Sequence, residues 1–288
     1  MDSYDYEKNP QGLSSYEGEL NVNYQYIYDY IEKHCYIERK IKILEIGTGG
    51  ARNLVALHKK YSEKAELFGT DISSSAIKYA SELNIGTFRL SSSEVIPFEE
   101  KFDLILMIDI LEHLESQEKV MHTLSNAQKY LSERGCIYIS VPTELNRFSL
   151  TWFFSKLFFF KNLTRIYFGH LIQFNTKSFL GMVDLNKLTV DECFYSVHFF
   201  SQIQMLFFFY CPKILLHIFL GKRQANNLRD SNELLDEGEH GLLSIAKKAF
   251  IGVSVPFAKL GFKESCIRKN SGFAAGNLHL LLTCKSYK

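Results

Sequence analysis

The chain has 288 residues, of which 46% are hydrophobic, so it is long enough and apolar enough to bury a full core. Its 33 Lys and Arg residues balance 32 Asp and Glu residues, and the net charge of +1 gives no electrostatic reason to expect a nucleic-acid partner. This balance favours a small or uncharged substrate.

The six cysteines are scattered without C-x-x-C or zinc-type spacing, and the N-terminus lacks the basic and apolar regions of a signal peptide. These features predict a cytoplasmic protein. Two stretches, 152–160 and 194–220, hold many of the 24 phenylalanines. Polar residues interrupt both, so we expect no transmembrane helix, whereas peripheral contact with a membrane stays open.

Taken in chain order, segments with the apolar pattern of a strand alternate with segments that have the apolar pattern of a helix. Residues 1–19 predict an irregular lead-in, and a helix is expected over 20–36. The expected strands are then 41–46, 65–70, 86–90, 102–108 and 136–141, and the expected helices are 51–61, 74–83 and 116–131. This alternation predicts an α/β fold with a parallel sheet that helices cover on both faces.

The second half is harder to divide. A phenylalanine-rich helical region is expected over about 148–220 and a charged loop over 223–239, while 278–284 predicts a strand that returns to the sheet. The expected parts are the lead-in and helix over 1–40, the ligand-binding core over 41–145, an aromatic-rich helical cap over 146–277 and the terminal strand over 278–288.

A glycine turn follows the first expected strand. Gly47 and Gly49 let the backbone turn sharply and let a nucleoside ligand approach it closely. A dinucleotide-binding motif would place its third glycine at position 52, where this chain has Arg52, so NAD is disfavoured. Glu45, near the end of the strand, is expected to face the crevice, where its carboxylate could meet an ammonium group. A turn without a ligand would have the same sequence.

Asp71 ends the second expected strand, 24 residues after Gly47. This is the position of an acidic residue that accepts hydrogen bonds from ribose hydroxyls. A helix cap is the alternative role for Asp71. The serines at 91–93 follow the third strand and could contact an adenine edge, although a serine run alone predicts only a loop.

Five segments together resemble class I S-adenosylmethionine-dependent methyltransferases, the broad group that includes the quinone-biosynthesis O-methyltransferases and the type 11 and type 23 methyltransferase domains. They are Leu44–Gly49, Gly69–Ser73, Ile96–Phe98, Phe102–Ile105 and Leu111–Leu114. The resemblance covers about 41–142. It implies a Rossmann-like, doubly wound, mainly parallel sheet of seven strands, with a large helical cap inserted before the last strands.

The resemblance also implies S-adenosylmethionine as the cofactor and a role for each matching residue. Glu45, Gly47, Thr48 and Gly49 would line its methionine part, Asp71 would hold the ribose, Ile72, Ser92 and Ser93 would meet the adenine, and Met107 would border the sulfonium. Two departures stand out. Ala51 replaces a glycine at the end of the first loop, and Ser92 replaces an aspartate for the adenine amino group.

His113 follows the fourth strand at the cofactor edge and is the candidate general base, although a histidine there can also serve only for packing. With Asp109, Glu112 and His170 it resembles a divalent-metal arrangement proposed for some relatives. Asp109 and Glu112 would share one face of a helical turn. A capping carboxylate and a surface glutamate are the simpler interpretation, so no metal is expected.

The acceptor is expected to be a hydroxyl group on a sugar, a lipid-linked molecule or another small molecule, because the cap is apolar and the charge disfavours nucleic acid. A quinone-type phenol is a second candidate. A non-catalytic module that binds the cofactor, and a partner or membrane through its aromatic cap, is the alternative outside enzymes. The sequence predicts neither the oligomeric state nor the identity of the acceptor.

Overall fold

A computed structural model describes residues 21–34, 40–156, 169–210 and 242–284. The lead-in expected over 1–19 and the charged loop expected over 223–239 lie outside these residues. Parts of the phenylalanine-rich region, at 157–168 and 211–220, lie outside them as well.

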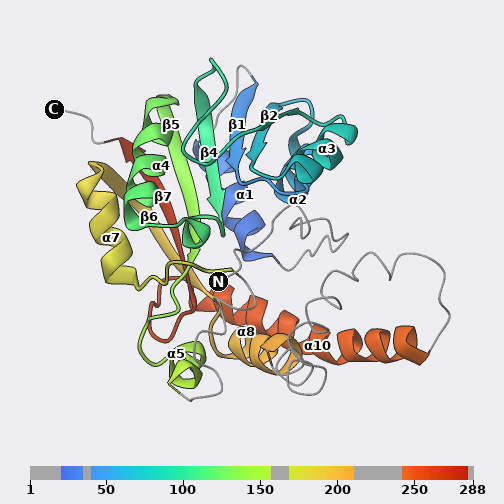
Figure 1. Cartoon of the computed structure of the whole chain (residues 1–288). Coiled ribbons are helices and arrows are strands. Elements are labelled where there is room, and N and C mark those ends of the chain that lie inside the picture. The colour runs from blue at the N-terminus through green and yellow to red at the C-terminus, as the bar shows by residue number, and fades with distance from the viewer. Residues whose placement is uncertain (1–20, 35–39, 157–168, 211–241, 285–288) are drawn as a thin grey trace.

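Seven strands form one sheet in the order β3-β2-β1-β4-β5-β7-β6 (Figure 1). They are β1 Ile41–Ile46, β2 Ala65–Asp71, β3 Thr87–Leu90, β4 Phe102–Ile108, β5 Leu131–Pro142, β6 Leu188–Ser196 and β7 Asn277–Cys284. The strands from β3 to β5 are parallel, and β7 is antiparallel to both of its neighbours. The expected seven-stranded, mainly parallel, doubly wound sheet is confirmed. Its strand order reverses between β1 and β4, the position where such sheets bind ligands.

Helices cover both faces of the sheet. One face carries α1 Val22–His34, α2 Arg52–Tyr61 and α3 Ser74–Glu82, and the other carries α4 Gln117–Lys129 and α7 Thr176–Leu185. Side chains of β4 alternate between the two cores, with Leu104 and Leu106 in the first and Ile105 and Met107 in the second. Because both faces are buried, the strand is apolar at nearly every position.

Strand β6 corrects the expectation of a helical cap over 146–277. It pairs with β7, and α7, which precedes it, packs on the sheet. The strand was missed because Asp191 and Glu192 interrupt its apolar pattern, beside a register shift between Val190 and Glu192. An edge strand with a bulge and charged side chains is protected against pairing with other chains. The sheet therefore divides the expected cap into two insertions, 143–175 and 197–276.

Further helices lie together below the sheet in Figure 1. They are α5 Leu150–Ser155, α8 Phe199–Gln204, the π-helix η3 Met205–Tyr210 and α10 Leu242–Ile267. Buried Gln202 joins these insertions: its amide donates to the carbonyls of Val197 and Ala274 at 2.7 and 2.6 Å and accepts from the Leu150 amide at 2.5 Å. Among the described residues, no helix combines the length and apolar character needed to cross a membrane.

A buried histidine lies where α1 meets the sheet. His279 on β7 is fully buried, with Nδ1 2.9 Å from the Tyr138 hydroxyl and Nε2 2.6 Å from the Ser196 hydroxyl. The Tyr138 hydroxyl donates in turn to Asn23 on α1 at 2.9 Å. Tyr138 therefore accepts from Nδ1–H, and Nε2 accepts from Ser196, so the neutral imidazole is fully hydrogen-bonded.

Burial, helped by nearby His198, lowers the pKa of His279 from 6.5 to about 3. The unfolded chain therefore binds a proton on this residue at pH values where the folded protein does not, and stability falls as the pH drops from about 6.5 toward 3. We expect His279 to contribute a loss of about 2 kcal/mol between pH 7 and 5. Urea unfolding at both pH values tests this, because His279→Gln should show a smaller loss. An equal loss in the variant would contradict the assignment.

Candidate active site

The turn between β1 and α2 has an unusual backbone. Gly47, Gly49 and Ala51 all have left-handed φ angles, of 76°, 51° and 60°. The amides of Gly47 and Thr48 donate to the Thr70 carbonyl at 2.8 and 2.9 Å, which fixes the turn to β2. A Cβ on Gly47 would lie 2.1 Å from Cδ1 of Ile110. Ala51, where the resemblance led us to expect a glycine, has the same left-handed conformation at some cost in strain.

Glu45 lies beneath this turn and is 1% exposed. Its carboxylate accepts hydrogen bonds from the Thr48 hydroxyl at 2.9 Å and the Asn53 amide at 2.6 Å. Burial raises the pKa of Glu45 to about 7, against the effect of both hydrogen bonds and of the nearby Arg52 charge. We predicted that Glu45 would face the ligand. The structure instead places it below the cavity, where it holds the turn in position.

Asp71 ends β2 at the edge of a cavity. Its carboxylate accepts from the Gly49 amide at 2.8 Å and from the Ser73 amide at 2.9 Å, so it joins the glycine turn to the start of α3. Ile72 beside it is 62% exposed, and both residues line the cavity. An oriented carboxylate next to an exposed apolar side chain suits a nucleoside, with the ribose on one and the base on the other.

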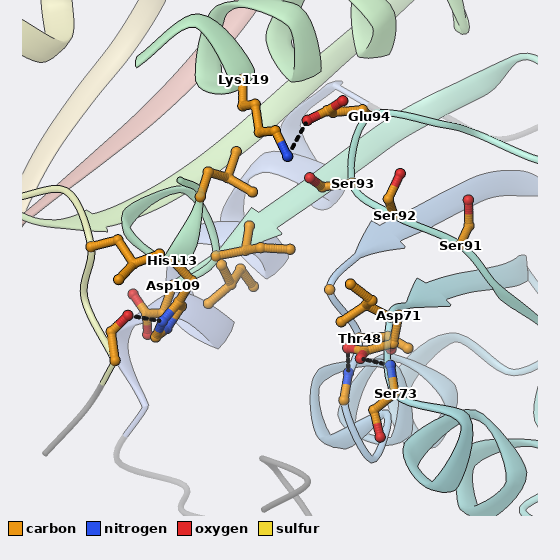
Figure 2. A pocket seen from close by; sticks show the side chains of 18 of the residues that line it. Thr48, Asp71, Ser73, Ser91, Ser92, Ser93, Glu94, Asp109, His113 and Lys119 are labelled. Atoms are coloured by element: carbon orange, nitrogen blue, oxygen red, sulfur yellow. Dashed lines mark hydrogen bonds and ion pairs between the residues drawn. The ribbon is translucent and has the colours of Figure 1, made fainter. Parts of the chain in front are cut away.

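The cavity has a volume of about 530 Å³, within the usual range for small-molecule sites. Figure 2 shows Asp109 and His113 on one side of it, with Thr48, Asp71 and the serines of 91–93 on the other. The predicted residues that line it are Gly47, Thr48, Gly49, Asp71, Ile72, Ser92, Ser93 and His113. The cavity therefore gathers most of the predicted site residues from segments that are distant in the sequence.

Met107 is a second correction. It was expected to border the sulfonium, but it is fully buried in the core beneath α4 and is not among the cavity residues. The next residues, Ile108 and Asp109, line the cavity instead. The alternation of β4 between two cores determines this, and a strand buried on both faces gives no pattern from which the side could be predicted.

Two cavity residues carry charges that the prediction did not assign to the cofactor. Asp109, with a φ of 52°, accepts a hydrogen bond from the Ser140 hydroxyl at 3.1 Å. Arg52 lines the cavity at the start of α2. We noted Arg52 in the sequence only as a departure from a dinucleotide motif, and Asp109 only as a metal candidate. A guanidinium and a carboxyl group that line one cavity could recognise the carboxylate and ammonium groups of an amino acid.

The serine loop forms the opposite part of the wall. The Ser91 amide donates to the Asp71 carbonyl at 2.9 Å, which places the loop beside the ribose position. Ser92, where the resemblance led us to expect an aspartate, lines the cavity, and so does Glu94, two residues later. The Glu94 carboxylate lies 3.6 Å from Lys119, which also pairs with Glu115 at 2.9 Å.

A cluster of titratable side chains lies at the edge of the cavity. Glu112 and His113 belong to the short helix η1 Leu111–His113, which follows β4. Burial, and then the charge of Asp109, raises the pKa of Glu112. Burial and nearby His170 lower the pKa of His113 to about 4, so its imidazole is neutral at pH 7. The predicted residues Glu112, His113 and His170 are brought together, whereas Asp109 lies with the cavity wall.

The comparisons agree with this geometry. Residues 37–163 match the family model of a methyltransferase domain. This part of the chain is a class I S-adenosylmethionine-dependent methyltransferase domain. A search of curated proteins found no significant match to the chain.

Solved structures show the same fold at low identity. A protein from Galdieria sulphuraria, provisionally named a sarcosine dimethylglycine methyltransferase, has a TM-score of 0.54 and 13% identity, over 90% of this chain and 83% of that one. The [4+2]-cyclase SpnF has a TM-score of 0.50 and 10% identity, over 90% of this chain and 80% of its own. These similarities support the fold of the methyltransferase.

The residues of the methyltransferase fit its cofactor, S-adenosylmethionine. Asp71 would provide the carboxylate for the ribose, and the glycine turn leaves the backbone open beside it. Arg52 and Asp109, which line the same cavity, would meet the amino-acid end. The bound cofactor supplies a methyl group on a sulfonium, whose leaving group is a neutral thioether.

Proposed function

We propose that this methyltransferase methylates a hydroxyl oxygen of a small molecule, either a sugar or a lipid-linked acceptor. The observation that carries the proposal is the cluster of Glu112, His113 and His170 at the edge of the cofactor cavity. A hydroxyl acceptor must lose its proton on methylation, so it needs groups that assist this loss. The remaining work is to place the acceptor in line with the methyl group.

His113 is the residue that we assign to the acceptor. It lines the cavity, and its Nδ1 lies 3.2 Å from the carbonyl of Gly169. A carbonyl only accepts hydrogen bonds, so Nδ1 carries the proton and Nε2 carries the lone pair. The low pKa keeps this lone pair available at neutral pH.

Apolar side chains near the site support an acceptor with an apolar part. Ile110, Leu114 and Leu171 line the cavity. In the outer insertions, Phe148 and Phe273 stack with ring centroids 5.5 Å apart and are 68% and 63% exposed. Exposed aromatic pairs of this kind are suited to a lipid surface or a lipid chain, so we favour a lipid-linked acceptor over a free sugar.

Methyl transfer to a panel of free sugars, lipid-linked sugars and phenols, measured with a labelled methyl group, tests the proposal. We expect O-methylated product from a lipid-linked or sugar acceptor, and a rate at least 100-fold lower in His113→Ala, within the usual range for loss of a proton-transfer group. His122→Ala, an exposed histidine on α4, is the matched control and should retain the rate.

Other outcomes have definite meanings. Transfer to phenols alone would favour the quinone-type alternative. Transfer to amines would contradict hydroxyl methylation. Tight cofactor binding without transfer to any acceptor would favour the non-catalytic module.

A further inference from the structure

Glu112 is buried without the hydrogen bonds that a buried carboxylate normally has. It is 1% exposed, and neither of its carboxylate oxygens accepts a hydrogen bond from another residue in the described part of the chain. Burying a carboxyl group in this way is costly unless a cation or a donor compensates it. Position 112 therefore requires an explanation beyond packing.

Two imidazoles face this carboxylate. Nε2 of His113 and Nε2 of His170 each lie 3.9 Å from Oε1 of Glu112. One ligand atom from each of the three residues lies within 4.8 Å of the others. Around a tetrahedral ion with bonds of about 2.1 Å, two ligand atoms lie roughly 3.4 Å apart, so each of the three ligand atoms would need to move inward by less than about 1 Å.

The second nitrogen of each imidazole fixes which way the first one points. Nδ1 of His113 donates to the Gly169 carbonyl, and Nδ1 of His170 lies 2.6 Å from the Glu144 carboxylate. A carbonyl and a carboxylate both accept, so each Nδ1 carries a proton and the nitrogen that faces Glu112 is Nε2, which holds the lone pair of a neutral imidazole. Histidines that bind metal ions typically donate their other N–H to such groups.

The backbone holds the two halves of the cluster together. The amides of Leu171 and Ile172 both donate to the Glu112 carbonyl, at 2.8 and 3.0 Å. This joins the segment of His170 to η1, although 57 residues separate His113 from His170. Gly169 and Leu171, on either side of His170, line the cofactor cavity with His113. The cluster is therefore ordered by backbone contacts and lies beside the reaction cavity.

We propose that Glu112, His113 and His170 form a binding site for a divalent first-row transition ion, such as Zn²⁺ or Mn²⁺, which takes the acceptor hydroxyl as a further ligand. Two imidazoles and one carboxylate suit these ions, whereas Mg²⁺ prefers oxygen ligands. Three protein ligands leave positions open for the acceptor. This inference reverses the expectation of no metal. It keeps Glu112, His113 and His170 from the arrangement noted in the sequence and leaves Asp109 out of the ligand set.

The role in catalysis rests on the proposed hydroxyl methylation and refines the part of His113, whose Nε2 lone pair then binds the ion and acts on the acceptor through that ion. The acceptor oxygen binds the ion, which lowers the pKa of its O–H group, and the proton leaves to water. An oxygen lone pair then forms the O–CH₃ bond as the S–CH₃ bond breaks, and that bonding pair stays on sulfur as the neutral thioether. Every charge is accounted for without a redox partner.

Metal binding is measured without reference to activity. The full chain, treated with a chelator and dialysed, is titrated by calorimetry with Zn²⁺, Mn²⁺ and Mg²⁺ separately, and with Co²⁺ by visible absorption. We expect one transition ion per chain, at least 100-fold weaker Mg²⁺ binding, and at least 100-fold weaker transition-ion binding in His170→Ala. Glu144→Gln should weaken binding by about 10- to 100-fold, as loss of a supporting carboxylate does.

His122→Ala is the matched control for a lost histidine and should bind metal as the wild type does. Circular dichroism establishes whether each variant is folded. If His170→Ala does not fold, the conservative Glu144→Gln variant provides an independent measurement of metal binding. Absence of stoichiometric binding in the wild type, or unchanged binding in His170→Ala, would overturn the site.

The experiments distinguish failure of the proposed metal site from failure of the proposed function. A bound ion without hydroxyl methylation would overturn the function and leave the site. Hydroxyl methylation that persists at the full rate in metal-free protein and in His170→Ala would overturn the role of the ion in catalysis and leave the function.

Discussion

Replacing Asp71 with alanine is expected to weaken S-adenosylmethionine binding at least 100-fold. The carboxylate lines the cavity where we expect the ribose to bind, and it also accepts from the amides of Gly49 and Ser73. Alanine removes the acceptors for the ribose and releases the glycine turn from α3 at the same time. A hydrogen bond to a charged group contributes about 1.5–3 kcal/mol, so losing two exceeds a 100-fold effect. Calorimetric titration with the cofactor or its demethylated product measures it.

Two further variants make this measurement specific. Asp71→Asn keeps the shape and one acceptor oxygen, so we expect an affinity between those of the wild type and Asp71→Ala. Asp29→Ala removes an exposed aspartate on α1 that does not line the cavity, and it should bind as the wild type does. Equal affinity in Asp71→Ala and the wild type would refute the assignment of the ribose site.

Replacing Gly47 with alanine is expected to lower both stability and cofactor affinity. The residue has a φ of 76°, and its new Cβ would lie 2.1 Å from Cδ1 of Ile110, itself a cavity residue. The left-handed backbone costs about 1–2 kcal/mol for a residue with a side chain, and Ile110 must also move. We expect a loss of about 1–3 kcal/mol in the free energy of unfolding and at least tenfold weaker binding. Urea unfolding and calorimetric titration measure the two effects.

The chain offers a matched glycine for comparison. Gly181 lies in α7, and a Cβ there would meet no atom within 4 Å. Alanine has the higher helix propensity, so Gly181→Ala should stabilise the protein by about 0.5–1 kcal/mol and leave cofactor binding unchanged. If both glycine variants changed stability in the same direction, the turn would not be the cause.

The two sides of the cavity carry different groups of candidate residues, one for the cofactor and one for the acceptor. Asp71 and the glycine turn belong to the β1–β2 side, whereas His113 and the segment of His170 belong to the β4–β5 side. We therefore expect the cofactor and the acceptor to meet where the strand order reverses. Substitutions on one side are expected to change cofactor affinity, and those on the other to change the rate.

Much of the fold followed from local patterns. The strand boundaries of β1 and β4 match the prediction, because both read as short apolar runs between turn or loop residues. Strand β6 was not predicted. An edge strand tolerates charged residues such as Asp191 and Glu192, and these hide its alternation of apolar and polar side chains. Its pairing with β7 joins residues about 90 positions apart, as in Val190 with Leu282, and no local pattern contains that information.

Some residues of the candidate site were likewise predictable from local sequence and others were not. Residues that act through their backbone or through a turn, such as Gly47, Gly49 and Asp71, were predictable because the spacing of strand, glycine and carboxylate is itself the signal. The sides of the sheet on which Glu45 and Met107 lie were not predictable, since both strands are buried on both faces.

The sequence by itself predicted the doubly wound sheet, because the alternation of strand and helix patterns is local, and it predicted the cofactor through the resemblance of five segments to class I methyltransferases. Only the tertiary structure decided that Glu45 supports the turn, that Arg52 and Asp109 line the cavity, and that His170 meets Glu112 and His113. The last of these depends on two backbone hydrogen bonds between η1 and a segment 57 residues from His113, and such contacts form only when the chain is folded.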